Sequence, residues 1–341
     1  MTPSHTFLIN TLQQGGISYK DVEIVEAPNA MDAAGYFKSG KVDAAVVWSP
    51  DDAACVEAVN GSKVLTSTKT ATHIIADVFI AKKEFIEKNK KALSNLFEGW
   101  MKGAAEINNS KAAHEEAAKI LAEGLNQPYD FCYNAIANTR LATYGDNLDF
   151  FGLNKNYTGV TGEDLFNKMT DEYSNLGYVS KKMNWRLVHT TDIVEMVNLT
   201  GPSNQSETAM TFTAPTQDMY DEKKVSAIST KSASINFASG SYTLSDDAKF
   251  IVDKEFVDIA KINTSARIRV IGNTDNTGNY QTNMSLSEKR AQAVVDYLVK
   301  EYGFAKNRFI VVGNGPKDAV EDGINGSSEN YRRTDFELIP E

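Results

Sequence analysis

Cysteine and histidine are scarce, with two cysteines and four histidines among 341 residues. Two cysteines are too few for a disulfide framework, and the scattered histidines and cysteines form no cluster with metal-ligand spacing. We therefore expect no metal ion and no other cofactor. Cys55 and Cys132 could pair in an oxidising compartment. Both fall in predicted helices with apolar neighbours, however, which favours two buried free thiols.

Long apolar runs and basic clusters are also missing. No run approaches the length of a transmembrane helix. The formal net charge is -10, with no basic stripe, which argues against nucleic acid and anionic membrane as partners. From Lys231 onward the chain has fourteen basic and sixteen acidic residues, so the acidity lies mostly in the first two thirds. Residues 1–5 lack the basic start and apolar core of a signal peptide.

Motifs of catalysis are absent as well. The sequence contains no Gly-x-Ser-x-Gly, no Walker loop and no His-Glu-x-x-His, and its many carboxylates form no recognisable acid/base pair. These absences predict a protein that is not an enzyme. The length predicts two or three domains, each able to bury a core.

The first two hundred residues alternate between helical and extended patterns. Extended runs are predicted at 22–25, 43–48 and 73–81, and the apolar Asp43–Trp48 run suits a strand buried on both faces. Strands separated by helices predict a parallel sheet of α/β type. The predicted helices are 4–14, 30–39, 51–59, a long one around 93–105, 111–124 and 162–176.

Two stretches of this region are candidates for binding a small anion. Ligands of open α/β sheets bind beyond the carboxyl ends of strands, which points to Trp48, Ser49 and Asp51. A helix start offers free backbone N–H groups, which points to Thr2, Ser4 and His5. The alternative is that Thr2 or Ser4 only caps its helix and Trp48 only packs.

The order of these patterns resembles the substrate-binding proteins of ABC transporters, in the type II fold of the sulfonate, nitrate and thiamine-precursor group. The residues that carry this resemblance are Thr2–Leu8, Val22–Val25 and Phe37–Pro50. It covers about residues 1–197. It implies a partial fold that starts at the second lobe, so that the chain is either cut from a longer protein or a natural short form. It also implies a small anionic solute and transporter membrane subunits as partners.

Residues 199–230 are predicted to be a linker. They contain Gly201-Pro202 and Ala214-Pro215 and few large apolar residues except around Met210–Phe212. The predicted division of the chain is therefore a first region at 1–198, this linker, and a C-terminal domain at 231–341.

The most informative segment is 272–291, where one acid and one base flank a polar loop. Arg267–Ile271 alternates as a half-buried strand should. The loop then carries Asp275, and Ser285 with Glu288 resembles a capping box that would start a helix near Leu286. Arg290 lies in the first turns of that helix. A carboxylate and a guanidinium so placed can hold a small zwitterion. The alternative from pattern alone is an ordinary surface turn and a capped helix.

This segment closely resembles the peptidoglycan-binding OmpA-like domain. The match covers about residues 232–340 and includes a first strand and loop at Ile235–Ser241. The residues in the family's order are Gly272, Thr274, Asp275, Gly278, Asn283, Leu286, Ser287, Arg290, Ala291, Val294, Tyr297, Leu298, Gly313, Gly315, Arg332 and Arg333. The family's usual histidine is Asn273 here, and Tyr331 replaces the usual asparagine before the arginine pair.

The resemblance implies an α+β domain that binds the diaminopimelate of the cell-wall stem peptide. Asp275 would take the ammonium and Arg290 the carboxylate. Thr274 belongs to the same motif, and Asn283 would brace the loop or add a hydrogen bond. For Arg332, ligand contact and a fold-stabilising ion pair both stay open.

The leading hypothesis is a non-catalytic envelope protein of a Gram-negative bacterium that binds peptidoglycan and tethers a solute-binding-like region in the periplasm. Because such a protein must be exported, the chain is expected to be a mature or truncated piece. The alternative is a transport-type binding protein for a small anion, with the C-terminal domain only as its anchor.

Overall fold

A computed structural model describes residues 2–207, 225–238 and 240–339 of the chain. Most of the predicted linker, including Met210–Phe212 and Ala214-Pro215, lies outside these residues, as do Met1, Ser239 of the predicted first strand and loop, and residues 340–341. The backbone forms two compact units. The first contains Met1–Phe7, Ile24–Val64 and Ile74–Met210, and the second contains Leu8–Glu23, Leu65–His73 and Thr211–Glu341.

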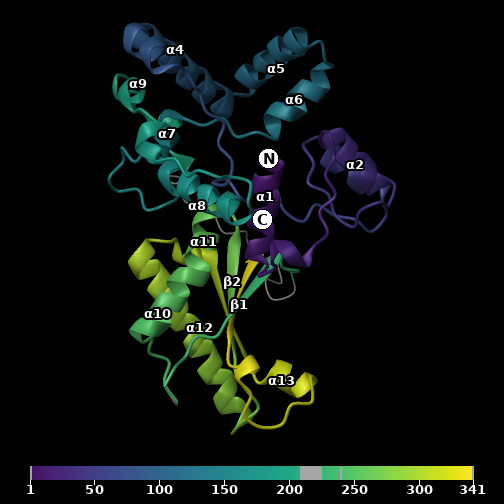
Figure 1. Cartoon of the computed structure of the whole chain (residues 1–341). Helices are drawn as coiled ribbons and strands as arrows, with labels where there is room; N and C mark the ends of the chain where they lie inside the picture. Colours follow the sequence, from purple (N-terminus) through teal and green to yellow (C-terminus); the bar gives the residue numbers. More distant parts are fainter. Residues whose placement is uncertain (1, 208–224, 239, 340–341) are drawn as a thin grey trace. The chain divides into compact units, whose positions relative to one another are not determined.

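The described part of the first unit is built from helices and irregular connections (Figure 1). Its helix α1 begins in this unit and continues into the second. The helices are α1 (Pro3–Gln14), α2 (Ala30–Lys38), α3 (Asp51–Ala58), α4 (Lys83–Asn109), α5 (Lys111–Leu125), α6 (Tyr129–Ala137), α7 (Tyr144–Phe150), α8 (Gly162–Asn175) and α9 (Asp192–Glu195). All six helices predicted for this region are confirmed. A small core joins α4, α7 and α9 through Met101, Tyr144 and Val194.

The three extended runs predicted in this region do not form strands. Residues 22–25, 43–48 and 73–81 are in no described ladder, and Trp48 is 57% exposed. An apolar run specifies an extended backbone, but a strand also needs a neighbour whose N–H and C=O groups pair with its own. The described part of this unit offers no such neighbour, so the strand predictions are wrong.

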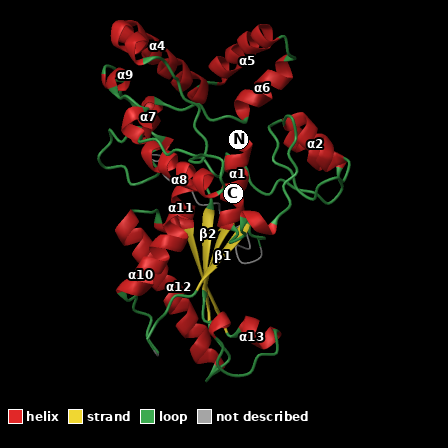
Figure 2. Cartoon of the chain, in the orientation of Figure 1, coloured by secondary structure: helices red, strands yellow, loops and turns green. Residues whose placement is uncertain are grey.

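The second unit contains the four-stranded sheet, drawn in yellow in Figure 2. The strands are β1 (Ser229–Ala233), β2 (Arg267–Asn273), β3 (Phe309–Gly315) and β4 (Thr334–Ile339), in the order β1-β4-β2-β3. β2 and β3 are parallel and the other pairs are antiparallel. The helices are α10 (Asp246–Val252), the π-helical η6 (Asp253–Val257), α11 (Asp258–Ile262), α12 (Tyr280–Tyr302) and α13 (Lys317–Glu321). This mixed sheet with helices confirms the predicted α+β class.

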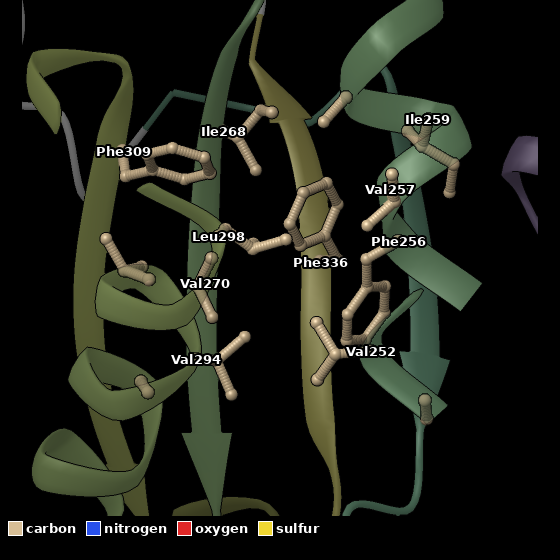
Figure 3. Packing of buried hydrophobic residues seen from close by; sticks show 14 of the residues in the cluster. Val252, Phe256, Val257, Ile259, Ile268, Val270, Val294, Leu298, Phe309 and Phe336 are labelled. Atoms are coloured by element: carbon tan, nitrogen blue, oxygen red, sulfur yellow. The ribbon is translucent and has the colours of Figure 1, made fainter. Parts of the chain in front are cut away.

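The core of this unit lies between the sheet and the helices α10–α12 (Figure 3). Ile268 and Val270 of β2 point toward Leu298 of α12, while Phe336 of β4 stacks on Phe256 with ring centres 4.7 Å apart. The apolar periodicity of α12 predicted this buried face, and Ala291, Val294, Val295 and Leu298 are all buried.

Two details of the predicted strands are wrong. Arg267 and Arg269 are buried rather than solvent-facing, and Arg269 is satisfied by an ion pair with Glu337 of the adjacent strand, at 2.5 Å. The first strand is Ser229–Ala233 rather than a run starting at Ile235. Its partner β4 pairs Ala233 with Thr334, where β4 itself begins, so the described ladder ends at that pair.

Candidate functional site

Helix α12 starts two turns earlier than predicted, and this changes how the site is built. Its N-cap is Asn279, whose side chain accepts a hydrogen bond from the N–H of Thr282 at 3.0 Å. Ser285 and Glu288 therefore lie inside the helix, and the capping box predicted there is wrong. The first two turns carry few apolar residues, so their sequence shows no helical stripe. Arg290 consequently lies in the third turn rather than at the helix start.

Glycine allows α12 to lie directly against the carboxyl ends of β2 and β3. A Cβ at Gly272 would meet the carbonyl oxygen of Ser287 at 2.1 Å, and one at Gly313 would meet Glu288 and the backbone of Met284. The buried hydroxyl of Ser287 accepts a hydrogen bond from the N–H of Gly315 at 2.9 Å. The motif glycines and Ser287 thus fix the helix that carries Arg290 beside the loop that carries Asp275.

Asp275 is 5% exposed and is held by groups from two loops. One carboxylate oxygen accepts from the hydroxyl and the N–H of Thr277. The other accepts from the N–H of Ser328 and from Arg332, each at 3.4 Å. Burial raises the pKa of this carboxyl, but these hydrogen bonds and the charge of Arg332 outweigh burial and hold the pKa below its ordinary value.

The two loops are themselves joined. Asn276 and Gly326 form an isolated β-bridge, and the side chain of Asn276 donates to the carbonyl of Ile324 at 3.3 Å. Asn283, in the first turn of α12, donates to the carbonyl of Thr277 at 2.8 Å. Asn283 therefore braces the loop, as one of its two predicted roles required.

Arg290 is half-buried and held in place by a third segment. Its guanidinium donates to the carbonyl of Ser241 at 3.0 Å and to that of Ala238 at 3.5 Å, and it lies 4.9 Å from the ring centre of Phe237. Burial lowers the pKa of this guanidinium, while the negative charge of Asp275 acts in the opposite direction. These two carbonyl contacts use only some of the guanidinium donors.

The remaining predicted residues of this site have structural contacts. Thr274 is buried and donates through its hydroxyl to the carbonyl of Asp275 at 3.0 Å. Arg332 is an ion-pair partner of Asp275 and of Glu329, with a side chain that is 45% exposed. Arg333 instead pairs with Asp318 and Asp335, at 2.5 and 3.0 Å. Thr277 and Ser328 were not predicted to take part.

The residues predicted to bind a solute lie in the first unit, where a hydrogen bond joins two of them, Trp48 and Ser4. The indole N–H of Trp48 donates to the hydroxyl of Ser4 at 3.0 Å. Ser49 accepts from the side chain of Asn138 at 3.0 Å. The ring of His5 makes an edge contact with the ring of Tyr178, and burial lowers the pKa of His5.

The other residues and predictions of this region can be placed as well. Thr2 is exposed, and Asp51 begins α3. Both cysteines are buried and free, which confirms the favoured reading of Cys55 and Cys132. Within the described residues, no cluster of histidine, cysteine or acidic side chains is suited to a metal ion. None of the described helices has the length and apolarity needed to cross a bilayer.

Comparison with known families identifies both parts of the chain. Residues 236–333 match the OmpA family, and residues 2–122 match the NMT1-like family. Residues 236–333 are thus an OmpA family domain, and residues 2–122 are NMT1-like, as both resemblances predicted. Each match covers less than half of the chain.

Individual relatives resemble the C-terminal part. Outer membrane porin F of Pseudomonas aeruginosa is 38% identical over 80 residues, which are 24% of this chain and 23% of that protein. Outer membrane protein A of Klebsiella aerogenes is 51% identical over 51 residues, or 15% of this chain and 14% of that protein. These alignments span less than a quarter of each relative's length.

Among solved structures, the OmpA-like domain of FopA1 from Francisella tularensis is 29% identical. The alignment covers 32% of this chain and 71% of the FopA1 chain, with a TM-score of 0.28. The peptidoglycan-associated lipoprotein of Burkholderia pseudomallei is 25% identical. The alignment covers 32% of this chain and 89% of the lipoprotein chain, with a TM-score of 0.26.

Proposed function

We propose that the C-terminal domain binds peptidoglycan through the diaminopimelate of its stem peptide. The observation that carries the proposal is the buried carboxylate of Asp275, whose negative charge acts on the anchored, half-buried guanidinium of Arg290, inside the segment that matches the OmpA family. Diaminopimelate ends in an ammonium and a carboxylate on one carbon, so this pair of opposite charges matches it group for group.

Ligand binding requires an exchange at Asp275. The carboxylate already accepts from Thr277, Ser328 and Arg332, and a carboxylate has few remaining lone-pair sites. Of these contacts, the one to Arg332 is among the longest and comes from a side chain that is 45% exposed. The ligand ammonium replaces Arg332 at Asp275, and the released guanidinium is then near enough to meet a ligand carboxylate.

The biological role that follows is non-catalytic attachment. The C-terminal domain docks on the wall of a Gram-negative cell envelope and keeps the NMT1-like region in the periplasm beside it. We retain the predicted division into a region at 1–198, a linker at 199–230 and a binding domain at 231–341.

Pull-down of the full chain with isolated peptidoglycan tests this function. We expect Asp275→Asn and Arg290→Gln each to abolish sedimentation with diaminopimelate-type peptidoglycan while thermal unfolding stays cooperative, since truncating one partner of a desolvated charge pair costs about 2–5 kcal/mol. Asp247→Asn and Lys300→Gln, exposed changes of the same chemistry in the same domain, should bind as wild type. Wild-type binding by both site variants would remove the assignment, as would equal binding to a wall that contains lysine in place of diaminopimelate.

A second function, binding of a small anionic solute by the NMT1-like region, is favoured by the family match at residues 2–122 and by the contact between Trp48 and Ser4. Membrane subunits of a transporter would then be further partners. We expect a sulfonate, phosphate or nitrate to raise the unfolding temperature, and Trp48→Ala to remove that shift while Trp100→Ala, another half-exposed tryptophan, keeps it. If no anion in the screen raises the unfolding temperature, the solute-binding function is contradicted and a structural role remains for this region.

A further inference from the structure

An open groove follows the solvent-facing side of α12, beside residues 240–244. Two adjoining hollows of about 440 and 490 Å³ form it, and both are lined by Tyr242 and Lys289. The first is also lined by Gln281, Thr282 and Ser285. Tyr242 and Lys289 therefore stand where the two hollows meet.

The groove is distinct from the Asp275–Arg290 site but adjoins it. Asp275 and Arg290 are not among the residues that line either hollow. Ser241, whose carbonyl holds Arg290, precedes Tyr242 in the chain, and Lys289 precedes Arg290 in α12. A ligand that is held by Arg290 and extends along the helix would enter this groove.

The groove combines an aromatic ring, hydroxyl and amide side chains, and the ammonium of Lys289. Tyr242 is 50% exposed, and the ammonium of Lys289 lies 5.6 Å from its ring centre. Among the ionic groups of the second hollow, Lys249 is paired with Asp246 at 2.9 Å, and Asp296 accepts from Gln292 at 2.8 Å. Hydroxyl and amide side chains therefore remain as partners for a ligand, together with the ammonium of Lys289 beside the ring of Tyr242.

We propose that this groove binds N-acetylated amino-sugar units of the glycan strand that carries the stem peptide. Such sugars offer hydroxyl and acetamido groups to Gln281, Thr282 and Ser285. Their C–H faces can lie against the electron-rich face of Tyr242. The inference rests on the proposed function, because the peptide held at Asp275 and Arg290 brings its own sugar to the groove.

Calorimetric titration of the full chain with two probes tests the inference: a diaminopimelate-containing stem tripeptide, and the same tripeptide on its disaccharide. We expect the wild type to bind the disaccharide-peptide roughly three- to tenfold more tightly than the free peptide. Tyr242→Ala should remove this difference and leave the affinity for the free peptide unchanged. Phe250→Ala, which removes another exposed aromatic from the same domain, should keep the difference.

The outcomes separate the groove from the Asp275–Arg290 site. A wild type that binds both probes equally would overturn the groove assignment and leave the proposed function standing. If Tyr242→Ala loses affinity for both probes, the groove binds the peptide rather than the sugar, and the groove assignment is again overturned. Binding of neither probe by the wild type would overturn the proposed function and this inference together.

Discussion

Asp275 is a buried carboxylate whose charge the surrounding loops stabilise. Thr277 and Ser328 donate to it and Arg332 pairs with it. The sequence predicted Asp275 and Arg290 as site residues because they stand in a dense local motif. It could not identify Ser328, which lies 53 residues further along the chain and contributes only its backbone N–H. Every residue except proline has a backbone N–H, so such a donor does not restrict the residue type at its position.

The depressed pKa of Asp275 predicts how stability depends on pH. The unfolded chain takes up this proton near the ordinary pKa of about 3.9, above the pKa of the folded state. The stabilisation is thus fully present above that ordinary value and is lost as the pH falls through the folded pKa. We expect the difference in unfolding free energy between wild type and Asp275→Asn to be about 1–3 kcal/mol at pH 7 and to shrink below pH of about 4.

Urea titrations of both proteins at several pH values measure this difference, with Asp247→Asn as the exposed control. A difference that grows as the solution becomes more acidic would contradict the assigned sign of the pKa shift.

Arg332 and Arg333 are neighbours with different predicted contributions to stability. Arg333 is 23% exposed and is paired with two carboxylates, so Arg333→Gln should lower the free energy of unfolding by about 3 kcal/mol. Arg332 is 45% exposed, and Arg332→Gln should change it by less than about 1 kcal/mol. Chemical denaturation of the two variants measures these free energies. A larger loss of stability in Arg332→Gln than in Arg333→Gln would contradict the prediction.

At the scale of elements, the contact of α12 with the strand ends is what builds the site. Its buried face was predictable, because apolar residues recur at helical spacing from Ala291 to Leu298. Its true start was not, because the N-cap is Asn279 and the next residues have no apolar stripe. The predicted cap, Ser285, is exposed, whereas Ser287 is buried and carries the structural hydrogen bond.

Exchange of each serine for alanine distinguishes these roles. Ser287→Ala leaves the buried N–H of Gly315 without its acceptor and should lower the free energy of unfolding by about 1–3 kcal/mol. Ser285→Ala should change it by less than about 0.5 kcal/mol. Equal effects in urea denaturation would show that the hydroxyl of Ser287 does not support the helix.

Gly272 tests the same contact sterically. Its missing Cβ would lie 2.1 Å from the carbonyl of Ser287, so Gly272→Ala must push α12 away from β2. We expect a loss of about 1–3 kcal/mol, together with weakened peptidoglycan binding because Arg290 moves with the helix.

Gly303→Ala is the matched control, since it imposes strain at a positive φ with open space around the new carbon. It should cost about 1 kcal/mol and leave binding intact. Full binding by Gly272→Ala would mean that Arg290 does not depend on this helix contact.

At the scale of the molecule, the two units are not two consecutive stretches of sequence. Residues 65–73 belong to the second unit, where Thr72 and Thr264 share a hydrogen bond at 2.6 Å and Ser265 donates to the carbonyl of Lys69 at 2.8 Å. Composition marked the region around 199–230 but could not reveal these contacts, because they involve polar surface residues with no sequence periodicity. In the C-terminal domain the alternation and the motif predicted the strand β2 and the helix after it, whereas β1 lies upstream of the expected run and the strands expected in the first unit were not formed.

Hydrogen exchange can test the assignment of residues 65–73 to the second unit. Leu298→Ala removes a fully buried side chain of the second core and should lower its stability by about 2–5 kcal/mol. We expect amide protection to fall in residues 65–73 along with β1–β4, while α4 and α5 keep theirs. Protection of 65–73 that instead follows α4 would place this segment with the first unit.

The bridge between Asn276 and Gly326 has a mechanical consequence. In the proposed complex, a stem peptide held by Asp275 would be attached to two stretches of backbone in parallel, one leading into β2 and one leading toward β4. A tensile load from a wall stretched by turgor would therefore be shared between neighbouring strands of one sheet. Such an attachment resists detachment by shear better than a single loop could.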